Sequence, residues 1–182
     1  MPEPTLTERQ LNRALLGRQL LLERVDLSLP RALERVGGLQ TQYAPTGYIG
    51  LWSLVAGFER NQLTKALERG SVVQGTLMRA TIHMVSRRDY PLFAAGVRDA
   101  RRDWWLGLAR RGLDAHTLRA TARRVRSLLA HSPLGRTEIM ERLGLNSVMW
   151  NGVGMCVDLL RGPPSGTWDR RRADLFAERR QL

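Results

Sequence analysis

The stretch SVVQGTLMRATIHMVS, residues 71–86, has the clearest strand pattern in this chain of 182 residues. It is rich in β-branched residues, and the types alternate through residues 81–85 as they do in strands. We predict two short strands here with a bend between them. Helical segments precede the pair, and the order helix, helix, helix, hairpin is that of a winged helix.

Capping and stop signals delimit the helices on both sides of this hairpin. Thr7 and Gln10 form a capping-box pattern at the start of a helix over residues 5–24. Ser28 and Pro30 begin a second helix, which ends at Gly37. Residues 38–52 are rich in Gly, Pro and aromatics, and we expect a shaped loop that leads into a short helix around Trp52. Further helices are expected over residues 62–69 (capped by Asn61), 88–110 and 114–130.

The second half of the sequence repeats this organisation. Thr137 is expected to cap a short helix that Gly144 stops, and another helix is expected over residues 147–160. Residues 161–178 resemble a hairpin that turns at residues 163–166 and is anchored by Trp168. We therefore predict a mainly α fold with short β-hairpins, built as tandem winged-helix (helix-turn-helix) modules. The modules span 1–110 and 111–182, the second truncated at its C-terminal end; the alternative is one helical domain with two hairpins.

Charge is the most informative bulk property. The chain has 29 Lys and Arg against 17 Asp and Glu, a formal net charge of +12, and Lys65 is the only lysine. Arginine forks bind phosphates through paired hydrogen bonds, so the charge favours a nucleic acid as the partner. A basic surface without a partner and an anionic membrane are the alternatives, although no long apolar face for a membrane helix stands out.

Other classes of protein are disfavoured. No apolar run approaches the roughly 20 residues that span a bilayer, the N-terminus does not resemble a secretory signal, and Cys156 is the single cysteine. We therefore expect a cytoplasmic, nucleoid-associated protein with no obligate protein partner. The three histidines lack the spacing of metal ligands, and the sequence has neither a phosphate-binding loop nor a nucleophile elbow. We expect no metal and no cofactor.

Gln40 and Gln42 form the most distinctive polar pair. In an extended segment, residues two apart project to the same side, so both amides can face one pocket. Such a pair can orient a water molecule but cannot titrate, and it suits only a reaction with a good leaving group. From spacing alone, solvated glutamines that satisfy loop backbone are the simpler interpretation.

Three separated motifs give this pair a context: LQTQYAPTGYIGLW, VVQGTLMRATIHMVSRRDY and PPSGTWDRRRADLFA. Together they resemble the AlkZ-type winged-helix DNA glycosylases, bacterial enzymes that excise bulky N-alkylated purines and unhook interstrand crosslinks. In that family a Gln-x-Gln motif is catalytic, and Gln40 and Gln42 match it; Thr41 stands where the family commonly has an apolar residue. The family continues into a third winged-helix unit, which helps to form the DNA-binding cleft; from the 182 residues of this sequence we expect no counterpart of that unit.

The resemblance implies that Gln40 and Gln42 position the attacking water on alkylated or crosslinked DNA. Candidate DNA contacts come from the loop beside the glutamines, from the first hairpin and from the second wing: Tyr43, Tyr48, Arg79, Thr81, His83, Arg170, Arg171 and Arg172. Solvation of the arginines and packing of His83 are the alternatives. For the whole chain, the alternatives to a glycosylase are a non-catalytic winged-helix regulator and an inactive remnant that binds DNA.

Overall fold

The computed structural model describes residues 5–108 and 114–177, and its fold is mainly α with short antiparallel strands, as the sequence predicts. The first half contains, in order, α1 (Glu8–Arg18), α2 (Leu29–Val36), β1 (Leu39–Gln40), α3 (Pro45–Leu54), α4 (Arg60–Glu68), β2 (Val72–Thr76), the 3-10 turn η1 (Met78–Ala80) and β3 (Ile82–Ser86). Helix α5 (Tyr90–Leu108) follows. The second half contains α6 (Ala115–Leu129), β4 (Leu134–Gly135), α7 (Arg136–Leu143), α8 (Ser147–Cys156), β5 (Leu160–Arg161) and β6 (Leu175–Ala177).

The two halves repeat one order of elements. The series α2, β1, α3, α4, β2, β3 has the same succession of helices and strands as α6, β4, α7, α8, β5, β6. In each series the first strand pairs antiparallel with the last, and the last two strands form a hairpin. This repetition agrees with the winged-helix class of the fold, and the division into two modules stays a prediction. The proposed boundary near residue 110 lies outside the described residues.

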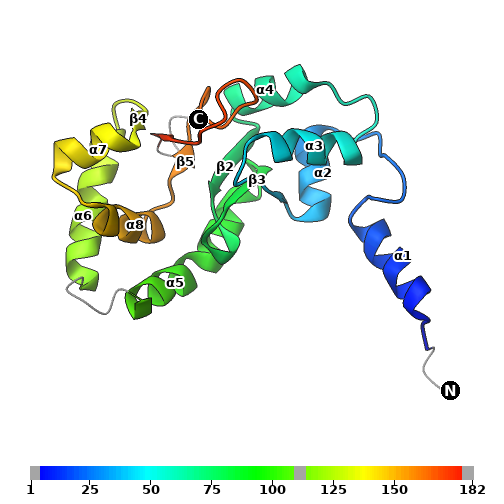
Figure 1. Cartoon of the computed structure of the whole chain (residues 1–182), viewed down its shortest axis with the longest axis horizontal. Coiled ribbons are helices and arrows are strands. Elements are labelled where there is room, and N and C mark those ends of the chain that lie inside the picture. Colours follow the sequence, from blue (N-terminus) through cyan, green and yellow to red (C-terminus); the bar gives the residue numbers. More distant parts are fainter. Residues whose placement is uncertain (1–4, 109–113, 178–182) are drawn as a thin grey trace.

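One six-stranded sheet joins the halves, in the order β1-β3-β2-β5-β6-β4. The join is a short antiparallel contact between the equivalent strands β2 and β5, where Gly75 is opposite Leu160. A Cβ at Gly75 would lie 2.7 Å from a ring carbon of Tyr90, so a side chain there would displace the start of α5. Helices α2–α4 therefore lie on one side of the central strands and α6–α8 on the other (Figure 1).

Each half has its own apolar core, and a third cluster lies where they meet. Leu33, Leu51 and Leu63 are buried in the first core. Val125 and Ile139 are buried in the second. The third cluster combines strands β2 and β3 with α5 and with Leu160 of β5, so burial of apolar surface holds the halves together.

Several helix boundaries differ from those predicted in the first half. Helix α1 has the predicted capping box but ends at Arg18, because the chain turns at Leu20, which adopts a φ of 59°. Helix α3 begins at Pro45, much earlier than expected, since the small and aromatic residues of this segment pack against the core. Helix α4 is capped by Glu59 through a capping box with Gln62 rather than by Asn61.

Two boundaries of the second half also differ. Gly135, not Thr137, occupies the N-cap position of α7. Helix α8 ends at Cys156 rather than at residue 160, because Leu160 belongs to β5 and pairs with β2. The residues beyond Ala177, where the second hairpin was expected to end, lie outside the described part of the chain.

Helix α1 projects away from the rest of the chain (Figure 1). It contains no buried residue, and Leu11 and Leu15 on its apolar side are exposed. Over the described residues, no helix is both long and apolar enough to cross a membrane.

Candidate active site

Strand β1 and the two residues that follow it place both glutamines on the outside of the fold. Gln40 is opposite His83 of β3, and the amide of Thr41 donates to the Ile82 carbonyl over 2.8 Å. The Thr41 side chain points inward and is 1% exposed, whereas Gln40 and Gln42 are both exposed. The alternation of exposed and buried residues that is expected from an extended segment is present over these three residues.

Glycines allow this segment to lie close to its neighbours. Gly37 ends α2 in the left-handed conformation. Gly38 follows with a φ of 90°, and a Cβ there would lie 2.9 Å from the Met84 carbonyl oxygen. A Cβ at Gly47 of α3 would lie 2.8 Å from the Thr41 methyl. The Gly-Gly pair thus brings β1 onto β3, and Gly47 lets α3 cover Thr41.

Each glutamine side chain is held by the β2–β3 hairpin. Arg79 Nη2 donates to Gln40 Oε1 over 3.3 Å, and the backbone amide of Ile82 donates to Gln42 Oε1 over 3.0 Å. A carbonyl oxygen accepts two hydrogen bonds, so one acceptor position remains on each amide. The hairpin therefore fixes the direction in which the remaining lone pairs point.

The turn that carries Arg79 has an unusual backbone. Arg79 and Ala80 adopt φ values of 52° and 56°, in the left-handed region that costs a residue other than glycine about 1–2 kcal/mol. Thr81 closes the turn. Its backbone amide donates to the Met78 carbonyl over 3.2 Å, and its hydroxyl donates to the same carbonyl over 3.1 Å. Local strain of this kind is common at functional sites.

A long loop from the second half reaches the glutamine segment. Between β5 and β6, Trp168 packs edge-on against Tyr48 with ring centroids 5.6 Å apart and joins the first core. Arg171 Nη1 donates to the Tyr43 hydroxyl over 2.8 Å. The amide of Gln74, buried in β2, donates to the Gly166 carbonyl over 3.1 Å. Trp168 thus anchors this loop, as predicted, but it does so on the other half of the chain.

A pocket of about 160 Å³ opens beside Gln42, between the halves. Ile82, Thr76 and Ala80 line it from the first half together with Gln42. The second half contributes residues of α8, of β5 and β6 and of the α8–β5 link: Trp150, Asn151, Gly154, Met155, Leu159, Arg161 and Phe176. Polar groups from distant parts of the sequence therefore meet next to one of the two glutamines.

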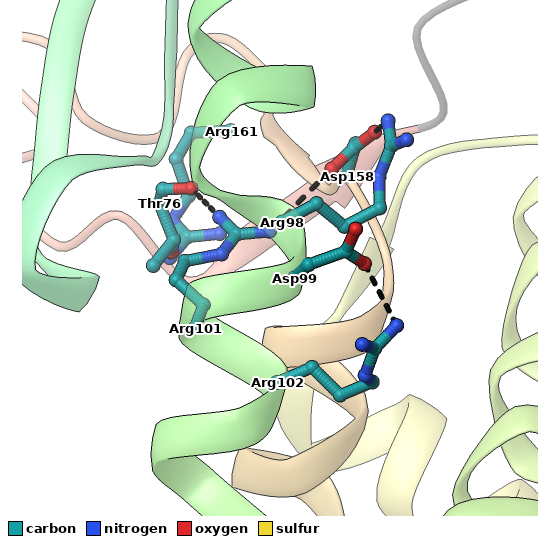
Figure 2. Close-up of polar contacts among 7 residues, drawn as sticks. All are labelled: Thr76, Arg98, Asp99, Arg101, Arg102, Asp158 and Arg161. Carbon is teal, nitrogen blue, oxygen red and sulfur yellow. Dashed lines mark hydrogen bonds and ion pairs between the residues drawn. The ribbon is translucent and has the colours of Figure 1, made fainter.

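Arginine side chains surround the end of β2 (Figure 2). Arg101 of α5 donates to the Thr76 carbonyl, and Arg161 Nη2 donates to the Thr76 hydroxyl over 3.1 Å. Asp158 neutralises part of this charge through ion pairs with Arg98 and Arg101. The strand that leads into the strained turn is thus fixed from both halves of the molecule.

The structure corrects two of the expected DNA contacts. Tyr48 is 2% exposed and its hydroxyl lies 3.0 Å from that of Thr64, so its ring is part of the core. His83 is 4% exposed, and its Nδ1 lies 3.0 Å from the Thr81 carbonyl, to which it donates. Burial lowers the pKa of His83 below its usual value, and the charge of Arg79 acts in the same direction. Neither side chain is presented to DNA.

The other expected contacts remain predictions. Tyr43, Arg79 and Arg171 are exposed close to the glutamines, and Thr81 is half-buried within the turn. Arg170 and Arg172 are also exposed, and Arg170 pairs with Asp174 at 3.6 Å.

Sequence reasoning missed the contribution of the second half to the pocket. Arg161, Asn151 and Thr76 lie far apart in the chain, and no spacing or motif connects them. Among the described residues, no group of three His, Cys, Asp or Glu side chains could hold a metal ion.

The fold defines a class of mainly helical proteins in which two similar halves, each with a helix-and-hairpin order, share one sheet. The exposed glutamine pair is the candidate site on this fold. A family profile described as "DNA glycosylase AlkZ-like" matches residues 33–181, and the chain belongs to this family. Among solved structures, the chain is similar to the Streptomyces sahachiroi DNA glycosylase AlkZ, with a TM-score of 0.78 and 19% sequence identity. No protein with a curated description matches the sequence.

The similarity covers 97% of this chain and 50% of the solved one, so the chain spans about half the length of that structure. At this level of identity the likeness concerns the fold, and it agrees with the predicted winged-helix class.

Proposed function

We propose that this chain carries the catalytic glutamines of a DNA glycosylase that hydrolyses the N-glycosidic bond of bulky alkylated purines in double-stranded DNA. The observation that carries the proposal is the exposed pair Gln40 and Gln42, each with one amide oxygen anchored by the hairpin and one acceptor position left. The family to which the chain belongs and the net charge of +12 support DNA as the partner.

The chemistry suits two groups that do not titrate. A purine alkylated at N7 or N3 carries a positive charge and leaves readily, so protonation of the leaving group is not required. The free lone pairs of Gln40 and Gln42 accept hydrogen bonds from the attacking water and direct it toward C1′ of the sugar. Their carbonyl dipoles also stabilise the positive charge that develops on the sugar, and the water proton passes to solvent.

Excision by glutamine variants tests this proposal. In a duplex with one N7-alkylguanine, Gln40→Ala and Gln42→Ala should each slow the formation of abasic sites by about 100-fold, the effect of losing one preorganised polar group. Alkali cleavage of the abasic strand measures the rate. Because neither amide titrates, the wild-type rate should be nearly flat from about pH 6 to pH 8.

The control is Gln19→Ala, which removes an exposed glutamine at the end of α1. It should excise at the wild-type rate, and all three variants should bind undamaged duplex almost as the wild type does. Excision at the wild-type rate by the double variant Gln40→Ala, Gln42→Ala would contradict the proposed roles. Strong preference for one undamaged sequence without any excision would instead indicate a regulator.

A further inference from the structure

The pocket beside Gln42 contains a positive charge that no carboxylate of the described chain neutralises. The Arg161 guanidinium lies 4.3 Å from the centroid of the Phe176 ring, and its Nη2 donates to the Thr76 hydroxyl. Its Nε is buried and has no hydrogen-bond partner among the described residues. The carboxylate of Asp158 is engaged by Arg98 and Arg101.

Such a charge is unfavourable in the free protein. Burial lowers the pKa of Arg161 to about 10, which still leaves the guanidinium protonated at neutral pH. A buried charge is costly unless it is paired, and an aromatic face and a hydroxyl compensate for only part of the lost hydration. The arrangement is therefore preorganised to receive an anion.

The other walls of the pocket agree with a small anionic group. Thr76, Asn151 and Gln42 contribute a hydroxyl and two side-chain amides, so donors converge on a pocket of about 160 Å³. No Asp or Glu lines the pocket. The alkylated purine itself carries a positive charge and would be repelled by Arg161, which argues against the damaged base as the occupant.

We propose that Arg161 binds a backbone phosphodiester of the DNA strand in this pocket, with its fork on the two non-bridging oxygens. This inference rests on the proposed function, because it requires DNA to lie along the glutamine segment. Phosphate contacts fix the register of a protein on a duplex. A phosphate held beside Gln42 would set the position of the neighbouring sugar relative to the water that the glutamines hold.

Neutral backbone substitutions test the contact directly. A stable abasic-site analogue in a duplex fixes the register of the complex, and single phosphates around it are replaced in turn by uncharged methylphosphonates. For the wild-type chain, replacement of the phosphate at one position should weaken binding by about tenfold, which is the effect of losing a hydrogen-bonded charge pair. With Arg161→Gln, the same replacement should change the Kd by less than about twofold.

Two further variants keep the test interpretable. Arg13→Gln removes an exposed arginine from the projecting helix α1, so it matches the loss of charge and should preserve the wild-type interference pattern. Arg161→Lys keeps the charge and loses the fork, and it should reduce the effect at that phosphate even if Arg161→Gln does not fold.

The outcomes separate this inference from the proposed function. A phosphate that is as sensitive in Arg161→Lys and Arg161→Gln as in the wild type, or a wild-type pattern with no sensitive phosphate, overturns the contact. Excision of N7-alkylguanine by the wild-type chain is measured in parallel, and its absence overturns the glycosylase proposal whatever the interference pattern. A weakening at one phosphate that is lost in Arg161→Gln, or reduced in Arg161→Lys, supports the contact.

Discussion

At the scale of single residues, the turn between β2 and β3 combines strain with a contact to the candidate active site. Arg79 and Ala80 are both left-handed, and neither is a glycine. This conformation brings the Arg79 guanidinium to Gln40 Oε1, 39 residues earlier in the chain. The strain is therefore located where it orients one of the two glutamines.

Replacing Ala80 with glycine should relieve part of this strain. The free energy of unfolding should rise by about 0.5–1 kcal/mol, because the gain at positive φ exceeds the greater backbone entropy of glycine in the unfolded chain. Ala95→Gly in α5 is the matched control, since the same exchange within a helix should lower stability by about 0.5–1 kcal/mol. Urea unfolding measures both variants, and changes of the same sign would show that residue 80 is not strained.

Some features of the candidate site could be predicted from the sequence at single residues, and others could not. The exposure of Gln40 and Gln42 with Thr41 buried was predictable, because it follows from the two-residue period of an extended chain. The bond from Arg79 was not, because it depends on a left-handed arginine. The burial of His83 was missed because both faces of β3 are covered, whereas the alternating pattern suggested one exposed face.

At the scale of elements, local capping chemistry accounts for the predictions that were confirmed. The Thr7–Gln10 box, the end of α2 at Gly37 and the start of α6 after Asp114 involve contacts within a few residues. The end of α8 was predicted wrongly, because Leu160 leaves the helical pattern to pair with a strand of the other half. Tertiary pairing, rather than propensity, decides that boundary.

Helix α8 offers a direct measure of how tertiary packing overrides propensity. A Cβ at Gly152 would lie 2.7 Å from both Leu118 Cδ2 and Trp105 Nε1, whereas one at Gly154 meets no atom within 4 Å. Gly154→Ala should stabilise the chain by about 0.5–1 kcal/mol through helix propensity. Gly152→Ala should destabilise it by about 1–3 kcal/mol through overpacking against α5 and α6. Thermal unfolding of the pair checks this contrast, and equal shifts would refute close packing at Gly152.

At the scale of the whole molecule, the halves are joined by contacts between residues far apart in the sequence. Trp168 enters the first core, Leu160 of β5 pairs with Gly75 of β2, and Arg161 donates to Thr76. The tandem order of elements was predictable because each module is built from local signals. The pocket was not, because it exists only where the two modules meet.

The ion pairs between α5 and the α8–β5 link should be essential to this junction. Asp158 pairs with Arg98 and with Arg101, and the side chain of Arg101 is only 4% exposed. Asp158→Asn leaves a buried guanidinium without its counter-ion, so the free energy of unfolding should fall by about 2–3 kcal/mol. Urea unfolding measures the loss.

Asp103→Asn in α5 is the matched control. It removes a carboxylate that is 65% exposed and pairs with Arg102, which also pairs with Asp99. An exposed pair of this kind should change stability by less than about 1 kcal/mol. If Asp158→Asn is as mild as this control, the ion pairs of Asp158 with Arg98 and Arg101 contribute little to holding the halves together.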